Sequence, residues 1–165
     1  MTSVMGRNIR GSLIALAVLV APRTAAAQAA VGPEAGVLTG FGDHTTQVGC
    51  RLTELSPHGG VDVLFATFPE AFGSGGVPVA LDLDATVAVP VFPGLFVAPR
   101  VGAGLVGAVG SSGGGGTFTV NLGVGVIGRV AGPLALRADV TEHRFIQDIS
   151  TPFRSFTVGV TWLLR

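Results

Sequence analysis

The sequence has no lysine and no tyrosine, and it has a single cysteine, Cys50. One cysteine excludes an intrachain disulfide framework, and the apolar residues two positions away on either side predict that Cys50 is an apolar filler. Only 12% of the residues are charged, about half the share of a typical soluble domain. With a mean hydropathy of +0.63, this composition predicts either a large covered apolar surface or a chain that lies in lipid.

Long apolar runs are also missing. After residue 27 no stretch of 18 uninterrupted apolar residues occurs, which excludes a conventional membrane helix there. The apolar run at residues 12–22 follows Arg7 and Arg10 and precedes the small residues Ala25, Ala26 and Ala27. This is the pattern of an export signal, and the run is too short to span a bilayer as a helix. We expect residues 1–27 to be a signal peptide, a retained N-terminal anchor being the alternative, and residues 28–165 to form one domain.

Positive charge is scarce in the part of the chain that would remain after removal of the signal peptide. Residues 28–165 contain seven arginines against ten acidic residues. No basic patch that could follow a phosphate backbone is present, so we expect no nucleic-acid partner.

What the sequence does have is alternation. At the C-terminus, Phe156, Val158 and Val160 alternate with polar or small residues, a period of two that predicts a β-strand. This last strand must pair with an earlier one, because nothing after it could cover its edge. Eight stretches alternate in this way, and we find no convincing helix: residues 35–42, 45–54, 61–68, 79–89, 95–108, 117–130, 134–145 and 153–165.

Pro99 interrupts the fifth stretch. A proline in mid-strand removes a donor of the hydrogen-bond ladder and belongs at an edge or a bulge. The strand either kinks at Pro99 or begins at Arg100.

The charged residues in the middle of these stretches share one parity, four of each sign: Arg51, Arg100, Arg129 and Arg137 with Asp62, Asp82, Asp84 and Asp139. An arginine that faces lipid near mid-membrane costs about 2–4 kcal/mol. If the chain is a membrane barrel, we therefore expect these eight side chains in the lumen, as a structural ion-pair network. A solvated outer face would explain the shared parity but not the balance of charge.

Glycines share the polar parity: Gly36, Gly40, Gly49, Gly102, Gly104, Gly123, Gly125 and Gly159. On an exposed face each would weaken its strand. In the lumen of an eight-stranded barrel, which is just wide enough for side chains, glycine would leave room for arginine.

Connection lengths point the same way. With the N-terminus in the periplasm, inner turns are expected at residues 55–60, 90–94 and 131–133. Outer loops are expected at 43–44, 69–77, 109–116 and 146–151. Mostly longer loops on one side are typical of outer-membrane barrels. The glycines of residues 111–116 lack the lysine of a phosphate-binding loop and are interpreted as a loop tip. The same topology places Phe41, Phe65, Phe118 and Phe156 near the outer interface and Trp162 near the inner one.

The stretches PLALRADVTEHRF and SFTVGVTWLLR resemble the last two strands of small outer-membrane barrels of the OmpX and OmpA-membrane-domain type. The resemblance implies an all-β fold, an eight-stranded antiparallel up-and-down transmembrane β-barrel. It also implies a monomer in the outer membrane, with outer-membrane lipid and the barrel-assembly machinery as partners. The final strand resembles the signal which that machinery reads, although Leu163, Leu164 and Arg165 follow the aromatic residue.

Few residues are candidates for catalysis or metal binding. His44, His58 and His143 show no metal-ligand spacing, so no metal and no cofactor are expected. Asp82 and Asp84 could pair as acid and base, but arginines on the same face favour structural ion pairing. The favoured hypothesis is a non-enzymatic envelope protein with a structural or weak binding role.

Two alternatives stay open. One is a soluble lipocalin-like barrel with an apolar ligand inside. The other is a lipid-modifying enzyme that would use His143 with Glu142 or Asp148 and with Ser150 or Ser155.

Overall fold

The structure is a computed structural model that describes residues 28–40, 43–56, 58–71, 76–110 and 113–164. The expected signal peptide, residues 1–27, lies outside the described residues, and so do Phe41 and Gly42. Within the described part, no helix is long and apolar enough to cross a membrane.

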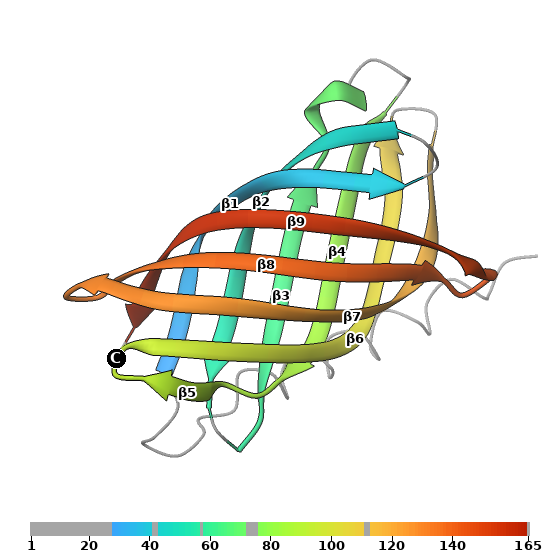
Figure 1. Ribbon diagram of the computed structural model, residues 1–165. Helices are drawn as coiled ribbons and strands as arrows, with labels where there is room; N and C mark the ends of the chain where they lie inside the picture. Colours follow the sequence, from blue (N-terminus) through green and yellow to red (C-terminus); the bar gives the residue numbers. More distant parts are fainter. Residues whose placement is uncertain (1–27, 41–42, 57, 72–75, 111–112, 165) are drawn as a thin grey trace, which may run out of the picture.

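Eight long antiparallel strands form the closed barrel that the alternation predicts (Figure 1). The strands of the barrel are β1 (Gln28–Gly40), β2 (Asp43–Leu55), β3 (Gly60–Thr67), β4 (Val77–Thr86), β6 (Leu95–Gly110), β7 (Gly113–Ala131), β8 (Leu134–Phe145) and β9 (Asp148–Leu164). Each pairs with its neighbours in sequence except that β4 pairs with β6, because the short strand β5 (Val89–Phe92) stands aside as a hairpin partner of β6. The predicted up-and-down β-barrel is confirmed.

The last strand closes the barrel. β9 pairs with β8 on one edge and with β1 on the other, with Ala29 opposite Leu164 and Val37 opposite Phe156. The expectation that the C-terminal strand pairs with an earlier one is therefore correct. It pairs with two, and this leaves no free edge in the ring of eight.

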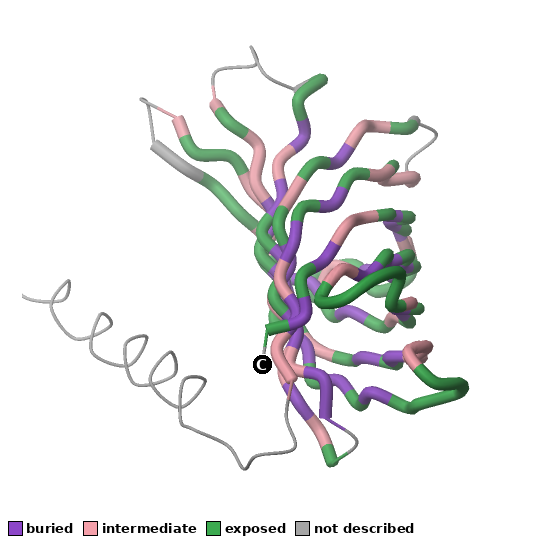
Figure 2. The backbone as a smooth tube through the Cα atoms, turned by 90° about the vertical axis from the view of Figure 1, so that its left-hand side faces the viewer, coloured by how far each residue is buried: buried purple, intermediate pink, exposed green. Residues whose placement is uncertain are grey.

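Buried and exposed residues alternate along the strands (Figure 2), and the polar parity faces inward. Asp62 is 0% exposed, whereas Phe65 on the same strand is 56% exposed. The side chains that point inward are mostly polar, and the outer wall carries valine, leucine and phenylalanine. The lipocalin-like alternative needs the opposite arrangement and is therefore wrong.

Strands run further than the sequence pattern indicated. β1 begins at Gln28, seven residues before the predicted start, and β2 already includes Asp43 and His44, which were expected to form a turn. The residues 113–116 of the expected loop tip are the first residues of β7. The expected loop at residues 146–151 becomes strand at Asp148. Hairpin hydrogen bonds continue past the point where side-chain alternation ends, because backbone groups pair whatever side chains they carry.

Two further expectations need correction. The segment after β3 contains one short 3-10 helix, η1 (Pro69–Ala71), although no helix was predicted. The expected turn at residues 90–94 includes most of β5, so the predicted fourth strand, residues 79–89, ends as β4 at Thr86, and the chain then enters a separate short strand.

The strand does not begin at Arg100, because β6 begins at Leu95 and continues through Pro99. On one side Pro99 is paired with Val124 of β7. On the other side the partner changes here from β4, whose last pair is Thr86 with Arg100, to β5, whose first is Val89 with Val97. The missing N–H of proline thus falls in the gap between two partner strands, where no ladder bond is lost.

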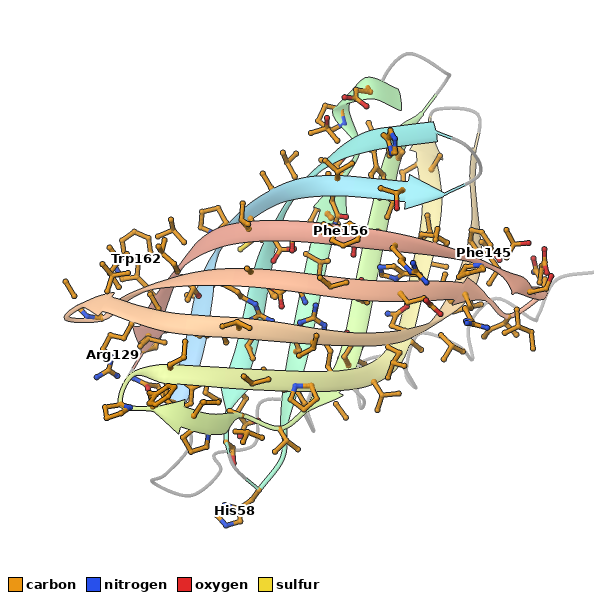
Figure 3. The ribbon with its side chains drawn as sticks, viewed as in Figure 1. His58, Arg129, Phe145, Phe156 and Trp162 are labelled. Atoms are coloured by element: carbon orange, nitrogen blue, oxygen red, sulfur yellow. The ribbon has the colours of Figure 1, made fainter. Side chains whose placement is uncertain are left out.

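The two ends of the barrel differ. We call the end with residues 58–59, 87–94 and 132–133 the turn end, and the end with η1 the loop end. Trp162 lies near the turn end as predicted, whereas Phe156 lies halfway along β9 and not near the loop end (Figure 3).

Apolar side chains are also buried in the interior, toward both ends of the barrel. A cluster around Ile127 and Leu163 lies toward the turn end, and one around Leu64 and Phe68 lies toward the loop end. The second cluster overlaps the polar lumen, because Leu64 is opposite both Arg51 and Asp82 in register.

Candidate functional site

The polar lumen is assembled from all eight strands of the barrel. Alternation aims every second side chain inward, so residues far apart in sequence meet across the interior. The side chains that carry the network are Glu34, Arg51, Thr53, Asp62, Asp82, Asp84, Arg100, Asn121, Arg137, Asp139, Thr141, His143 and Ser155. None of these residues is more than 6% exposed.

Arg51 is clamped between carboxylates of the two flanking strands. Its Nε lies 2.7 Å from Oε2 of Glu34 and its Nη2 donates to Oε1 of the same residue at 3.1 Å. Its Nη1 lies 2.5 Å from Oδ1 of Asp62. The two parallel bonds to Glu34 are the bidentate geometry that makes arginine–carboxylate pairs strong and directional.

Arg137 joins this pair to the opposite wall. Its Nη2 lies 2.8 Å from Oδ2 of Asp62, and its Nε lies 2.6 Å from Oδ2 of Asp139. Its Nη1 also donates to the hydroxyl of Thr53, which in turn donates to Asp62 at 2.6 Å. Asp62 is therefore shared by two guanidinium groups, which compensates its complete burial.

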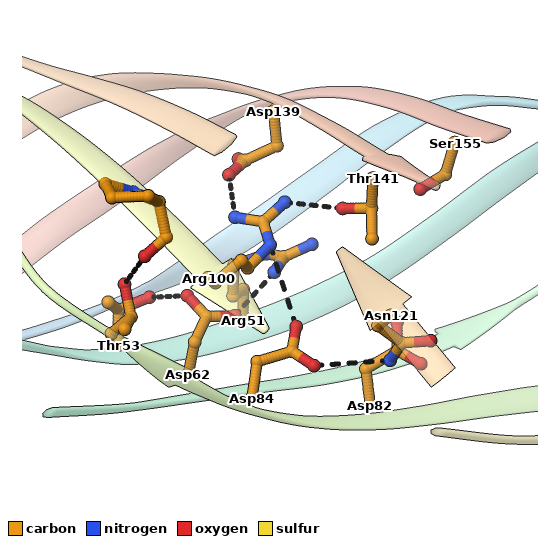
Figure 4. A network of polar contacts seen from close by, with 12 residues as sticks. Arg51, Thr53, Asp62, Asp82, Asp84, Arg100, Asn121, Asp139, Thr141 and Ser155 are labelled. Carbon is orange, nitrogen blue, oxygen red and sulfur yellow. Dashed lines mark hydrogen bonds and ion pairs between the residues drawn. The ribbon is translucent and has the colours of Figure 1, made fainter. Parts of the chain in front are cut away.

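Arg100 continues the chain of contacts toward the loop end (Figure 4). It pairs with Asp139 through Nη1 and donates from Nη2 to Thr141 at 2.6 Å. Its Nε lies 3.6 Å from Oδ2 of Asp84. The three arginines and their partners thus form one connected network, and removal of any one member leaves charged neighbours in the low-dielectric interior.

Glycines make the space for this network. A Cβ atom at Gly125 would clash with Oδ1 of Asp139 and would lie 3.3 Å from Nη1 of Arg100. The expectation that inward glycines accommodate the arginines therefore agrees with the geometry at this position.

Uncharged polar groups follow toward the loop end. His143 lies 3.0 Å from Oγ of Ser155 through Nε2 and 3.0 Å from Oδ1 of Asn121 through Nδ1. Asn121 also accepts from Thr119 at 2.9 Å and donates to Asp84 at 3.3 Å. The ring of Phe153 stacks on His143 with centroids 4.8 Å apart, which covers this group.

The predicted enzyme residues are only partly brought together. His143 and Ser155 are in contact, but Glu142 points to the outer wall, where it pairs with Arg144 and Arg154. Asp148 accepts hydrogen bonds from Ser150 and Thr151 in the hairpin between β8 and β9. Neither acid nor Ser150 can complete a site around His143. The residue that does orient His143, Asn121, was missed because it lies on another strand.

Seven of the eight charged residues predicted for the lumen lie there. The exception is Arg129, which is exposed at the turn end of β7 (Figure 3). Its parity is that of the lumen, but the register with β8 shifts between Arg129 and Ala131, and the residue lies past the apolar cluster around Ile127.

Glu34 was missed, because the first strand was expected to begin one residue later. It has the parity of Gly36, so extending the alternation by one step would have found it. The balance of four charges of each sign consequently does not hold inside the barrel.

Metal-ligand clusters are not found: the described residues contain no group of three or more histidine, cysteine, aspartate or glutamate side chains placed to hold a metal ion. His44 and His58 are exposed. Cys50 is an exposed free cysteine on the outer wall.

Solved structures with the same fold include small outer-membrane barrels and designed transmembrane β-barrels. The N-terminal β-barrel domain of Pseudomonas aeruginosa OprF matches with a TM-score of 0.58 at 14% identity, over 82% of this chain and 97% of that one. Neisserial surface protein A matches with a TM-score of 0.56 at 8% identity, over 84% and 97%. Ail, the attachment invasion locus protein of Yersinia pestis, matches with 0.55 at 12% identity, over 84% and 97%. No protein-family model and no curated protein sequence matches this chain. The chain thus has the fold of the small eight-stranded outer-membrane barrels.

Proposed function

We propose that the chain is a resident, non-enzymatic protein of the outer membrane, exported with residues 1–27 as its signal peptide and folded there as a monomer. One observation carries the proposal: in the described residues, 28 large hydrophobic side chains are exposed, whereas charged side chains are buried inside. Patches of this extent are rare on soluble monomers. They match the apolar outer band of a membrane barrel, and lipid is the partner that would cover them.

The lumen supports a structural role within the envelope. The ion-pair network crosses the interior, and two clusters of buried apolar side chains fill further parts of it. A lumen filled in this way resists collapse of the barrel and leaves no wide channel. We therefore propose that the protein is a structural component of the envelope that can also bind a ligand weakly at the loop end. We further propose that it is not a general pore.

The first test is where the protein goes and how it migrates. Cells expressing the chain are fractionated, and the membrane fraction is run on a denaturing gel with and without boiling. We expect recovery in the outer membrane, faster migration before boiling, and a mature N-terminus at Gln28 by mass spectrometry. Recovery in the soluble fraction without a mobility shift contradicts the proposal. Conductance across a planar bilayer then tests the filled lumen, because steady porin-like currents would contradict it.

Biogenesis supplies a second test. We propose that the barrel-assembly machinery receives the chain through β9, whose alternating residues end at Trp162 and Leu164. A peptide of residues 153–165 should slow assembly of the full chain into membranes that contain the machinery. A peptide with the same composition in scrambled order is the control, and equal inhibition by both would contradict recognition of β9.

One contact favours a second candidate, an enzyme that acts on acyl esters. Ser155, His143 and Asn121 stand in the order nucleophile, base and orienting group. Nε2 of His143 lies 3.0 Å from Oγ of Ser155, and its Nδ1 lies 3.0 Å from Oδ1 of Asn121. Against it, Ser155 is 2% exposed and the stacked Phe153 covers His143. Fatty-acid release from phospholipid by the folded barrel, abolished in both Ser155→Ala and His143→Ala, would establish this activity. Membrane lipids that stay unchanged in cells making the wild-type chain would remove it.

A further inference from the structure

The described lumen contains more negative than positive charge. Three guanidinium groups, those of Arg51, Arg100 and Arg137, face five carboxyl groups, those of Glu34, Asp62, Asp82, Asp84 and Asp139. All of them are at least nine-tenths buried. The remaining described arginines do not help, because Arg129, Arg144 and Arg154 are exposed.

The deficit is two charges, and among these five carboxylates only Asp82 has no arginine partner. Asp62 and Asp139 are each shared by two arginines, Glu34 has Arg51, and Asp84 has the more distant Arg100. Asp82 has no guanidinium nitrogen within 4.0 Å among the described residues. Its nearest basic atom is Nδ1 of His143, at 4.0 Å.

One carboxylate oxygen of Asp82 also has no hydrogen-bond partner. Its Oδ1 is buried without a hydrogen bond, and so is Oδ2 of Asp84, two residues along the same strand. A buried ionised carboxylate without compensation is costly. Oδ2 of Asp84 already has Nε of Arg100 at 3.6 Å, so a further positive group is expected beside Oδ1 of Asp82.

The oxygens converge over a glycine. Gly104 of β6 is opposite Asp82 in register. A Cβ atom there would clash with Oδ1 of Asp82 and would lie 2.6 Å from Oγ1 of Thr119. A carboxylate oxygen from β4 and a hydroxyl oxygen from β7 are therefore directed at the same small region, and Nδ2 of Asn121 lies 3.1 Å from the same Cβ position.

The donor set restricts the class of occupant. Carboxylate and hydroxyl oxygens are hard ligands that suit alkali and alkaline-earth cations and not zinc or copper. Asp82 and Asp84 are two carboxylates, fewer than a dedicated divalent cage provides, and no cluster of three such ligands occurs in the described residues. A single positive charge offsets Asp82, the one carboxylate without an arginine, and the second excess negative charge is shared by four carboxylates that arginines contact.

We propose that the lumen binds one monovalent metal cation, Na⁺ or K⁺, between Oδ1 of Asp82 and Oγ1 of Thr119. The ion compensates the charge of Asp82 and links β4 to β7 across Gly104. It goes beyond the proposed structural role by adding a ligand on which the stability of the barrel depends.

The test is a urea titration of the refolded full-length mature chain in detergent micelles, followed by the fluorescence of Trp162. Sodium chloride replaces choline chloride at constant total salt, and potassium chloride is run as a separate series. Because the ion binds the folded state, each tenfold rise in its concentration above the dissociation constant should raise the ratio of folded to unfolded protein about tenfold. Stability that is equal in choline and in both metal salts would overturn the proposal.

Two variants separate the site from a general salt effect. Asp82→Asn keeps the shape and removes the charge, so it should lose the metal dependence and be more stable than the wild type in choline. Asp148→Asn, an exposed carboxylate in the β8–β9 hairpin, is the matched control and should keep the full response. A metal response retained in Asp82→Asn would overturn the proposal.

A third variant tests the site without changing a buried charge. Thr119→Val removes one oxygen while keeping the volume, and it should shift the concentration for half-maximal stabilisation at least several-fold upward. If wild-type stability instead rises as pH falls, with no dependence on Na⁺ or K⁺, the compensating group is a proton and the proposal is wrong.

Discussion

Replacing Arg137 by alanine tests how much the lumen network contributes to stability. Arg137 pairs with Asp62 and Asp139 and also donates to Thr53, and its side chain is 4% exposed. Breaking a buried pair costs about 3–5 kcal/mol, because it leaves an uncompensated charge in the interior. Asp62 keeps Arg51 and Asp139 keeps Arg100, so we expect a loss near the lower bound, about 3 kcal/mol.

The assay is equilibrium unfolding in urea, in detergent micelles, followed by the single tryptophan of the chain. Arg137→Met separates charge from volume, because it keeps the length of the side chain. Adding Asp139→Asn to Arg137→Met should recover part of the loss, and the double-mutant cycle then measures the coupling between the two residues. Arg154→Ala, which breaks an exposed pair with Glu142, is the control and should leave the midpoint unchanged. An Arg137→Ala variant as stable as the wild type would refute the network as a source of stability.

Three further predictions concern other parts of the wall and the loop end. Gly125→Val should prevent folding or shift the gel mobility to that of unfolded chain, because its side chain would occupy the space of Asp139; normal folding would contradict the packing described. Val158→Arg, in the apolar outer wall, should destabilise the barrel in a bilayer by about 2–4 kcal/mol. An arginine placed on the same face at the end of the strand is the control and should cost less, and an equal loss of stability at both positions would argue against lipid contact. Hydrogen bonds from the Thr46 hydroxyl and amide to Glu70 lower the pKa of that carboxyl. The stabilisation from these hydrogen bonds is therefore present at neutral pH and is lost as pH falls through the lowered pKa. An NMR titration of Glu70 should give a lower pKa in the wild type than in Thr46→Val.

Alternation in the sequence was sufficient for the fold, because a period of two is a local property of the chain. It gave the identity of the eight strands and, through the shared parity of Asp62, Asp82 and Arg137, their inward face. The bounds of β8 were predicted to the residue, since a tight turn with Gly132 at one end and a change of pattern at the other limit it. The strands on the loop side were predicted too short, because there backbone pairing continues without a side-chain signal.

Contacts across the lumen depend on register, which no single strand contains. A shift of one residue moves a side chain to the other face. Arg129 keeps the lumen parity, because it is still opposite Ala135 in register, and it is separated from the network because it lies past the apolar cluster around Ile127. The sequence by itself determined that arginine and aspartate would be shut inside a β-barrel with an apolar outer wall. Only the tertiary structure decided that Glu34 joins them, that Asn121 orients His143, and that Asp82 is left without an arginine, because distances between strands far apart in the chain are fixed only when the barrel closes.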